Sequence, residues 1–391
     1  MEITVGNLIK KAKLVRCGGG EYPVLSMTMH DGLMFQNDRF KKQIASIDKS
    51  KYQIVYRHQL VESFPIDEGV LAVQELTEAG IVSPAYKIWD VNMEKVVPKY
   101  LEFALRAPRS IEYYKSKLRG TTARRRSITD TEFCAMKINC PSLIEQERIV
   151  DVIEKTKNII NVRRLELDTL DNLIKARFVE MFGDPIKNPK GWKVATIGDV
   201  VTEVRYGTSK PAVEGGKYPY IRMNNITSDA HLDLNDLKYI DIPDDEIEKC
   251  VVRKGDVLFN RTNSVELVGK TAFFDLPQDM VIAGYIIRLR LSEKMLPEVL
   301  VQYMNLEALK KILRSMAKGA VNQANINAQE LQSIKLYIPD MDLQKQFIEM
   351  KGQIDKSKVL SETHIFYAEK SITPTTPEIF LKGRCIYGNE F

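Results

Sequence analysis

The sequence contains no long hydrophobic run and few residues of the kinds that hold metals. Its apolar stretches stop well short of the roughly 18 residues that a membrane span needs, and the N-terminus lacks the apolar segment of a signal peptide. Five cysteines are scattered along the chain and never form a C-x-x-C pair, which favours reduced structural thiols over disulfides or zinc ligands. We therefore expect a cytoplasmic protein that contacts no membrane and holds no metal.

Motifs of catalysis and nucleotide binding are also missing. There is no glycine-rich phosphate loop, no G-x-G-x-x-G between an expected strand and helix, and no Asn/Asp-Pro-Pro-aromatic motif of an amino-methyltransferase. The acids Asp67, Glu68 and Glu75 are the nearest match to a nuclease site, but its lysine is absent, and solvated acids are the simpler interpretation. The sequence therefore predicts a chain that is not an enzyme, with no catalytic residue and no cofactor of its own.

Charge is nearly balanced over the whole chain but is unevenly distributed. The chain carries 57 Lys and Arg against 52 Asp and Glu, a net charge of +5. Residues 1–140 hold 22 of the basic residues against 16 acidic ones, whereas residues 191–340 hold 19 against 20. Any attraction to a polyanion must therefore be local.

The stretch from Ser142 to Phe182 predicts a single long helix, because it contains neither glycine nor proline. Pro141 precedes it and Gly183-Asp184-Pro185 follows it, as is typical of helix boundaries. Steps of four and three residues place apolar side chains at seven of ten positions, the narrow seam of a coiled coil. At about 1.5 Å per residue the helix would be roughly 60 Å long and would need a partner helix. The ten seam positions are Ile149, Ile153, Thr156, Ile160, Arg163, Leu167, Leu170, Ile174, Arg177 and Met181.

Four short motifs occur twice in the same order, at a nearly constant offset of 196 to 199 residues. Such spacing predicts a duplicated half-chain. It also makes a second helical stretch, Met341–Lys370, the natural antiparallel partner of the first, with Phe347, Met350, Ile354, Ser357 and Ser361 at its seam. The repeated motifs are Gly20-x-Tyr22-Pro23 with Gly216-x-Tyr218-Pro219, Val55-x-Arg57-x-x-x-Val61 with Val251-x-Arg253-x-x-x-Val257, Pro98-x-x-Leu101 with Pro297-x-x-Leu300, and Lys137, Pro141 and Gln146 with Lys335, Pro339 and Gln344.

The fold class predicted is α+β, with two similar mixed α/β domains separated by two long helices that pack as an antiparallel coiled coil. The expected parts are a first domain at 1–141, a central helix at 142–183, a second domain at 184–340, a distal helix at 341–370 and a tail at 371–391. Within the first domain, apolar runs predict strands at 53–61 and 85–91, and helices are expected at 98–105 and 110–118.

Arginine and amide side chains crowd into several expected loops of both domains. Arginine can bind guanine through two hydrogen bonds, and asparagine or glutamine can do the same with adenine, so such loops suit the reading of base edges in double-stranded DNA. Lysines nearby suit phosphates. The alternative is that Asn-rich loops only satisfy turn geometry. The candidate DNA-binding residues are Arg124, Arg125, Arg126, Lys41, Lys42, Arg222, Asn224, Asn225, Arg261, Asn263, Asn322, Gln323 and Asn325.

These features together resemble one known family. Over about residues 4–365 the chain resembles the DNA-specificity subunit of a Type I restriction–modification system. The motifs that carry the resemblance are Thr196–Val200 after Trp192, Tyr218–Arg222, Arg253–Leu258, Ile334–Pro339 followed by Gln344, and Phe182–Pro185.

The resemblance implies that two target-recognition domains each read one half of a bipartite DNA site. It also implies that the helices fix the spacing and dock two methyltransferase subunits, with restriction subunits joining through the complex. S-adenosylmethionine and ATP with Mg²⁺ would then bind the partner subunits. The seam residues expected on the docking helices are Ile149, Ile153, Ile160, Leu167, Leu170, Ile174, Phe347 and Ile354.

Two other interpretations stay open. A structural coiled-coil adaptor with two protein-binding domains would fit the mild net charge and the near-neutral second domain. A stand-alone nuclease or methyltransferase would require catalytic motifs that the sequence lacks.

Overall fold

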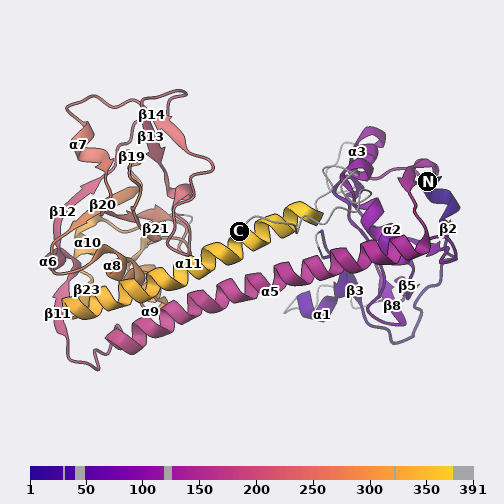
Figure 1. Ribbon diagram of the computed structural model, residues 1–391, viewed down its shortest axis with the longest axis horizontal. Coiled ribbons are helices and arrows are strands. Elements are labelled where there is room, and N and C mark those ends of the chain that lie inside the picture. The colour runs from indigo at the N-terminus through magenta and orange to yellow at the C-terminus, as the bar shows by residue number, and fades with distance from the viewer. Residues whose placement is uncertain (30, 40–48, 119–125, 321–322, 373–391) are drawn as a thin grey trace, which may run out of the picture. The chain divides into compact units, whose positions relative to one another are not determined.

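The computed structural model describes all residues except His30, 40–48, 119–125, 321–322 and 373–391 (Figure 1). The chain forms two compact units, Met1–Val162 with His364–Phe391, and Arg163–Thr363. Among the described residues, no helix combines the length and the apolar content that crossing a membrane requires.

The first unit is built around an antiparallel sheet with the strand order β2-β9-β6-β7. Its apolar core joins this sheet to α2 and α4, and Leu60, Leu101 and Phe133 are fully buried there. Small strand pairs β1-β10, β3-β4 and β5-β8 complete the unit. Its helices are α1 (Gln36–Arg39), α2 (Pro98–Leu105), α3 (Pro108–Lys117) and α4 (Asp130–Ala135), with 3-10 turns η1 (Val5–Asn7) and η2 (Ile66–Glu68). The strands are β1 (Glu2–Thr4), β2 (Ile9–Lys11), β3 (Leu25–Met27), β4 (Leu33–Phe35), β5 (Gln53–Tyr56), β6 (Leu60–Glu62), β7 (Leu71–Val73), β8 (Ala79–Val82), β9 (Lys87–Val91) and β10 (Lys137–Asn139).

The second unit repeats this plan with longer strands. Its central antiparallel sheet has the order β12-β20-β16-β18, and β13, β14, β15 and β19 form a second sheet. Its helices are α6 (Ile197–Val200), α7 (Ile247–Cys250), α8 (Pro297–Met304), α9 (Glu307–Met316) and α10 (Ala328–Gln332), with the 3-10 turn η4 (Met223–Asn225). The strands are β11 (Lys193–Thr196), β12 (Val201–Tyr206), β13 (Tyr218–Ile221), β14 (Lys238–Ile240), β15 (Val251–Val252), β16 (Val257–Asn260), β17 (Thr262–Asn263), β18 (Thr271–Phe273), β19 (Met280–Ile282), β20 (Ile286–Leu291), β21 (Lys318–Ala320), β22 (Gln323–Asn325) and β23 (Lys335–Ile338).

The duplication predicted from the motifs is confirmed by the topology. The order β2-β9-β6-β7 of the first unit matches β12-β20-β16-β18 of the second, and the pair β1-β10 matches β11-β23. Proline begins both α2 and α8, where its missing N–H costs nothing, and a capping box begins both α4 and α10. The two halves of the chain therefore share one fold.

One buried glutamine in each unit ties the start of a long helix to the globular fold. Gln146 accepts a hydrogen bond from Val97 N at 2.8 Å and donates to the carbonyls of Lys95 and Pro141 at 3.3 and 2.9 Å. Gln344 accepts from Leu296 N at 2.9 Å and donates to the carbonyls of Lys294 and Pro339 at 3.1 and 2.8 Å. Both side chains are fully buried. We call this contact the glutamine brace, and it explains why the motif that ends in glutamine occurs twice.

Both long helices are present. Helix α5 runs from Leu143 to Phe182 and α11 from Met341 to Ile372, within two residues of the predicted bounds. In α5, all ten predicted seam positions are buried or half-buried. The helix ends at Gly183, whose φ of +88° lies in the left-handed region that favours glycine.

Within the second unit the two helices pack antiparallel (Figure 1). Phe347 near the start of α11 contacts Phe178 and Phe182 near the end of α5, with ring centroids 5.2 and 5.5 Å apart. Further along α11, Lys358 contacts Asp171, which lies earlier in α5. The predicted seam of α11 was wrong at Ser357, which is exposed, because the four-residue step from Ile354 places Lys358 inward.

The short elements of the first unit were predicted unevenly. Helix α2 has the predicted bounds 98–105, and α3 begins two residues earlier than expected because Pro108 starts it. The single strand expected at 53–61 is wrong: it is two strands, β5 and β6, separated by a turn in which His58 has a φ of +69°.

Candidate nucleic-acid interface

In the first unit, the described end of the arginine-rich loop is anchored by Arg126. Its guanidinium lies 2.8 Å from Asp67 and 3.2 Å from Glu68, and its carbonyl accepts a hydrogen bond from Ile66 N. Asp67 is only 3% exposed. Arg126 therefore holds the loop end against η2, and the two acids bind an arginine rather than surround a metal. Arg124, Arg125, Lys41 and Lys42 lie outside the described residues.

No group of three or more His, Cys, Asp or Glu side chains that could hold a metal occurs in the described part of the chain. The four described cysteines, Cys17, Cys134, Cys140 and Cys250, are all free. Burial raises the pKa of the Cys134, Cys140 and Cys250 thiols.

In the second unit, Arg222 and Asn225 build the turn that follows β13. Arg222 donates to the carboxylate of Asp236 at 2.8 Å and to its carbonyl at 2.9 Å. Asn225 is 3% exposed, accepts from Arg222 N and donates to the carbonyl of Asp233. The neighbouring Asn224 is exposed. Turn geometry accounts for Arg222 and Asn225, and their contact with DNA stays a prediction.

The loop after β16 brings further candidates together. β17 pairs with β22, so that Asn325 Oδ1 accepts from Thr262 Oγ1 at 3.0 Å, while Asn263 Oδ1 accepts from Ser264 N at 2.9 Å. Arg261 lies between β16 and β17 with its guanidinium over the ring of Tyr206, 4.9 Å from the ring centre. Asn322 and the side chain of Gln323 lie outside the described part of the chain.

Sequence reasoning missed two exposed tyrosines beside Arg261. Tyr206 ends β12 and is 42% exposed, and Tyr285 precedes β20 and is 52% exposed. Each has a glycine neighbour, and a Cβ on Gly207 would collide with the carbonyl oxygens of Ile282 and Ala283. Tyr-Gly and Gly-Tyr at the ends of neighbouring strands were the available signal, because such glycines mark a close backbone approach.

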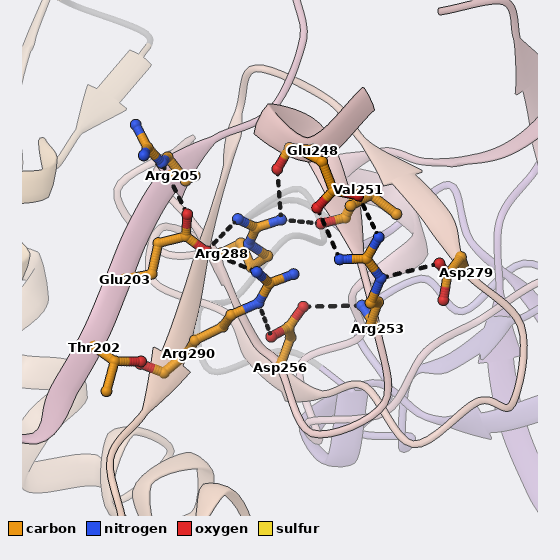
Figure 2. Close-up of polar contacts among 10 residues, drawn as sticks. All are labelled: Thr202, Glu203, Arg205, Glu248, Val251, Arg253, Asp256, Asp279, Arg288 and Arg290. Carbon is orange, nitrogen blue, oxygen red and sulfur yellow. Dashed lines mark hydrogen bonds and ion pairs between the residues drawn. The ribbon is translucent and has the colours of Figure 1, made fainter. Parts of the chain in front are cut away.

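A charge network joins strands β12, β15 and β20 (Figure 2). Arg288 is fully buried and donates to Glu203 at 2.7 Å and to the carbonyl of Val251. Arg290 donates to the same carboxylate at 2.9 Å. Burial opposes ionisation of Glu203, but the hydrogen bond from Arg205 and the charges of Arg288 and Arg290 lower its pKa. Glu203 therefore stays ionised and joins β12 to β20.

The same network explains the Arg-Lys-Gly-Asp motif at Arg253–Asp256, of which the first unit shares only the arginine, Arg57. Asp256 accepts a hydrogen bond from Arg253 N at 2.9 Å and another from Arg290 Nε at 3.0 Å, and Gly255 between them has a φ of +101° (Figure 2). The side chain of Arg253 bonds Glu248 and Asp279. This motif therefore shapes the turn into β16.

The residues expected on the docking helices have two kinds of surroundings. Phe347, Ile174 and Ile160 are buried, and the other five, Ile149, Ile153, Leu167, Leu170 and Ile354, are half-buried. Ile174 and Phe347 belong to the core of the second unit, with Ile354 packed against it, and Ile149 packs against the core of the first. The exposed apolar side chains of the two helices are Leu143, Ile144, Val152, Ile159, Val162, Leu165, Leu173 and Val179 on α5, and Val359, Leu360, Phe366 and Tyr367 on α11.

Comparison with known proteins gives a consistent result. Residues 189–365 match the family model described as Type I restriction modification DNA specificity domain. The chain is 30% identical over 199 residues to a protein assigned as the type I restriction enzyme MjaX specificity subunit of Methanocaldococcus jannaschii, covering 50% of this chain and 47% of that protein. It is 22% identical over 288 residues to the type I restriction enzyme EcoKI specificity subunit of Escherichia coli K12, covering 69% of this chain and 62% of the relative.

The chain thus spans less than two thirds of the length of either curated relative. Its fold is similar to a chain from the structures that describe complex assembly and conformational transition of the type I R-M system. That match has a TM-score of 0.60 and 17% identity and covers 97% of both chains.

Proposed function

We propose that the chain is the DNA-recognition subunit of a Type I restriction–modification complex, because residues 189–365 match the family model described as Type I restriction modification DNA specificity domain. Each unit reads one half of a bipartite site in double-stranded DNA. The chain supplies no catalysis; it directs methyltransferase and restriction subunits to that site.

The observation that carries this proposal is the duplicated fold. Two units have the same strand order, and an equivalent glutamine braces each of them to a long helix. A single-site binder has no use for this repetition, whereas a bipartite DNA site requires two readers at a fixed separation. A helix of 40 residues is a stiff connection for that purpose.

The exposed apolar side chains of α5 and α11 support the docking of partner subunits on these helices. Exposed branched and aromatic side chains, such as Ile159 and Leu165 on α5 and Phe366 on α11, cost solvation free energy unless a partner covers them. We assign this cover to two methyltransferase subunits, with restriction subunits joining through them. S-adenosylmethionine would bind the former, and ATP with Mg²⁺ the latter.

Exchange of residues 4–140 for the corresponding domain of another family member tests the proposal. The hybrid would be expressed with the neighbouring methyltransferase, and methylated adenines would be mapped by sequencing. We expect one half of the methylated sequence to change and the other half to persist. An unchanged methylated sequence, or purification with an unrelated assembly and no DNA footprint, would favour a structural coiled-coil adaptor instead.

A further inference from the structure

Arg261 differs from the other arginines of residues 191–340 in its electrostatic surroundings. This region contains seven arginines, and six of them lie within 3.1 Å of a carboxylate. Arg261 has no carboxylate within salt-bridge distance among the described residues. The six paired arginines are Arg205, Arg222, Arg253, Arg288, Arg290 and Arg314. Because the region as a whole is nearly neutral, an uncompensated guanidinium makes a local positive site.

The guanidinium of Arg261 is supported by an aromatic ring. It lies over Tyr206, 4.9 Å from the ring centre, which is a cation–π arrangement. The ring itself is fixed, because Tyr206 Oη accepts a hydrogen bond from Ala328 N at 2.8 Å. A planar group stacked on a fixed ring keeps its orientation, so less conformational entropy is lost when it binds a ligand.

The backbone of Arg261 is fixed on both sides. Its N–H donates to the carbonyl of Tyr285 at 2.9 Å, and its carbonyl accepts from Ile326 N at 2.9 Å. These two bonds tie the residue to the residue before β20 and to the residue after β22. Arg261 is therefore positioned by the folded unit rather than by a free loop.

The folded chain does not use the side-chain donors of Arg261. Its Nε is buried without a hydrogen-bond partner among the described residues. The Nε atoms of Arg222 and Arg288 are unpaired as well, but those two guanidiniums bond a carboxylate, whereas the guanidinium of Arg261 has no such bond among the described residues. The two flanking tyrosines, Tyr206 and Tyr285, are about half exposed and leave the site open to solvent.

We propose that Arg261 is the residue through which the second unit reads a guanine, its guanidinium donating to O6 and N7 of that base in the major groove. The forked, planar donor set of a guanidinium matches the two acceptors of guanine. A lysine ammonium, a point charge suited to phosphate, does not match them. Tyr206 is a positioning residue, because its ring fixes the plane of the Arg261 guanidinium. This inference rests on the proposed function.

The test uses the full chain assembled with its methyltransferase subunits. Once the methylated sequence is known, each guanine in the half-site of the second unit is replaced in turn by 7-deazaguanine, which lacks the N7 acceptor. Binding of wild-type, Arg261→Ala and Arg314→Ala complexes is measured at one salt concentration. Arg314 is the matched control, because it lies in the same unit and pairs with Glu307 at 2.8 Å.

We expect wild-type and Arg314→Ala complexes to lose roughly 10- to 150-fold in affinity at one 7-deazaguanine position, the loss that corresponds to one of the two hydrogen bonds from the charged guanidinium. The Arg261→Ala complex should be insensitive to the same replacement and should methylate sites with any base there. Tyr206→Leu should weaken the discrimination without abolishing it.

Three results would overturn the inference. The half-site of the second unit could contain no guanine; Arg261→Ala could remain as sensitive to 7-deazaguanine as the wild type; or it could weaken binding equally on all sequences, which is the behaviour of a phosphate contact. Each of these leaves the proposed function intact. A wild-type complex that selects no sequence would instead refute the proposed function.

Discussion

Lys358 Nζ lies 2.7 Å from Asp171 Oδ1 inside the helix pair of the second unit. Lys358 is only 8% exposed, and Ser361, one turn further along α11, is 2% exposed. The hydrophobic seam of the pair therefore gives way to polar side chains beyond Ile354. A buried charge pair at such a position tolerates one alignment of the helices and penalises others.

Removal of one member of this pair should destabilise the second unit. Lys358→Ala leaves the Asp171 carboxylate in the seam without its partner, and we expect a loss of about 1–3 kcal/mol in the free energy of unfolding, since Asp171 keeps some solvent contact. Urea unfolding followed by circular dichroism measures this.

A matched control and a double variant sharpen that result. Lys155→Ala breaks a solvent-exposed pair between Lys155 and Asp151 within α5, the helix that also carries Asp171. It should cost less than about 0.5 kcal/mol. The double substitution Lys358→Met with Asp171→Leu should cost less than Lys358→Ala alone. Equal losses for Lys358→Ala and Lys155→Ala would contradict the role of the buried pair.

Loss of the glutamine brace should have similar effects in both units. Gln344→Ala leaves one buried N–H and two carbonyls without partners, and Gln146→Ala does the same in the first unit. We expect each substitution to cost about 2–4 kcal/mol, because unsatisfied buried groups carry a full desolvation penalty. Thermal unfolding of the two single variants measures it. If only one of the two variants lost stability, the two glutamine braces would share a geometry without contributing equally to the free energy of unfolding.

The pH dependence of stability should carry a contribution from Lys310. Burial, with the charges of Arg314 and Lys270, lowers the pKa of Lys310 to about 8, and its Nζ donates to the carbonyl of Gly269. The unfolded chain therefore binds more protons than the folded one between about pH 8 and 10.5, so stability rises with pH in that window.

The matching variant is Lys310→Met, which removes this titration. Between pH 7 and 9.5 we expect the wild type to gain about 1–2 kcal/mol in the free energy of unfolding relative to Lys310→Met. Lys311→Met, at the exposed neighbouring position, should leave the pH profile of the wild type unchanged. Parallel profiles for wild type and Lys310→Met would contradict the assignment.

Arg126 should affect recognition of only one half of the DNA site. Arg126→Ala removes the contacts to Asp67 and Glu68 that hold the end of the arginine-rich loop. We expect lower methylation at the half-site of the first unit and an unchanged requirement at the other. Mapping of methylated adenines checks this, with Arg109→Ala as the control because Arg109 pairs with Glu2 at the surface. Equal effects of the two variants would count against it.

Much of the fold could be predicted because it depends on local pattern. The absence of glycine and proline defined α5, and its seam spacing identified which side chains face inward. The repeated motifs located the duplication because their residues have structural tasks, such as the brace that Gln146 forms in the first unit and Gln344 in the second. A residue with such a structural task can be replaced by few others, so the same residue type is found at the equivalent position of both halves of the sequence.

The candidate site was harder to predict, because the partner of a polar side chain is set by tertiary packing. Sequence alone could not distinguish Arg222, which pairs with Asp236, from Arg261, which has no acid nearby among the described residues. Asn225 and Asn325 look identical in a loop, yet one is buried in its own turn and the other bonds Thr262 across two strands. The support of Tyr206 depends on residues more than 50 positions away.

The glutamine brace has an evolutionary consequence. In each unit its amide contacts main-chain atoms of three residues, and the one further contact is with a side chain, the Cys140 thiol of the first unit. Main-chain donors and acceptors survive nearly every substitution, so the surrounding sequence can drift while the attachment of domain to helix is inherited unchanged. New specificities can then arise by rewriting the loops alone.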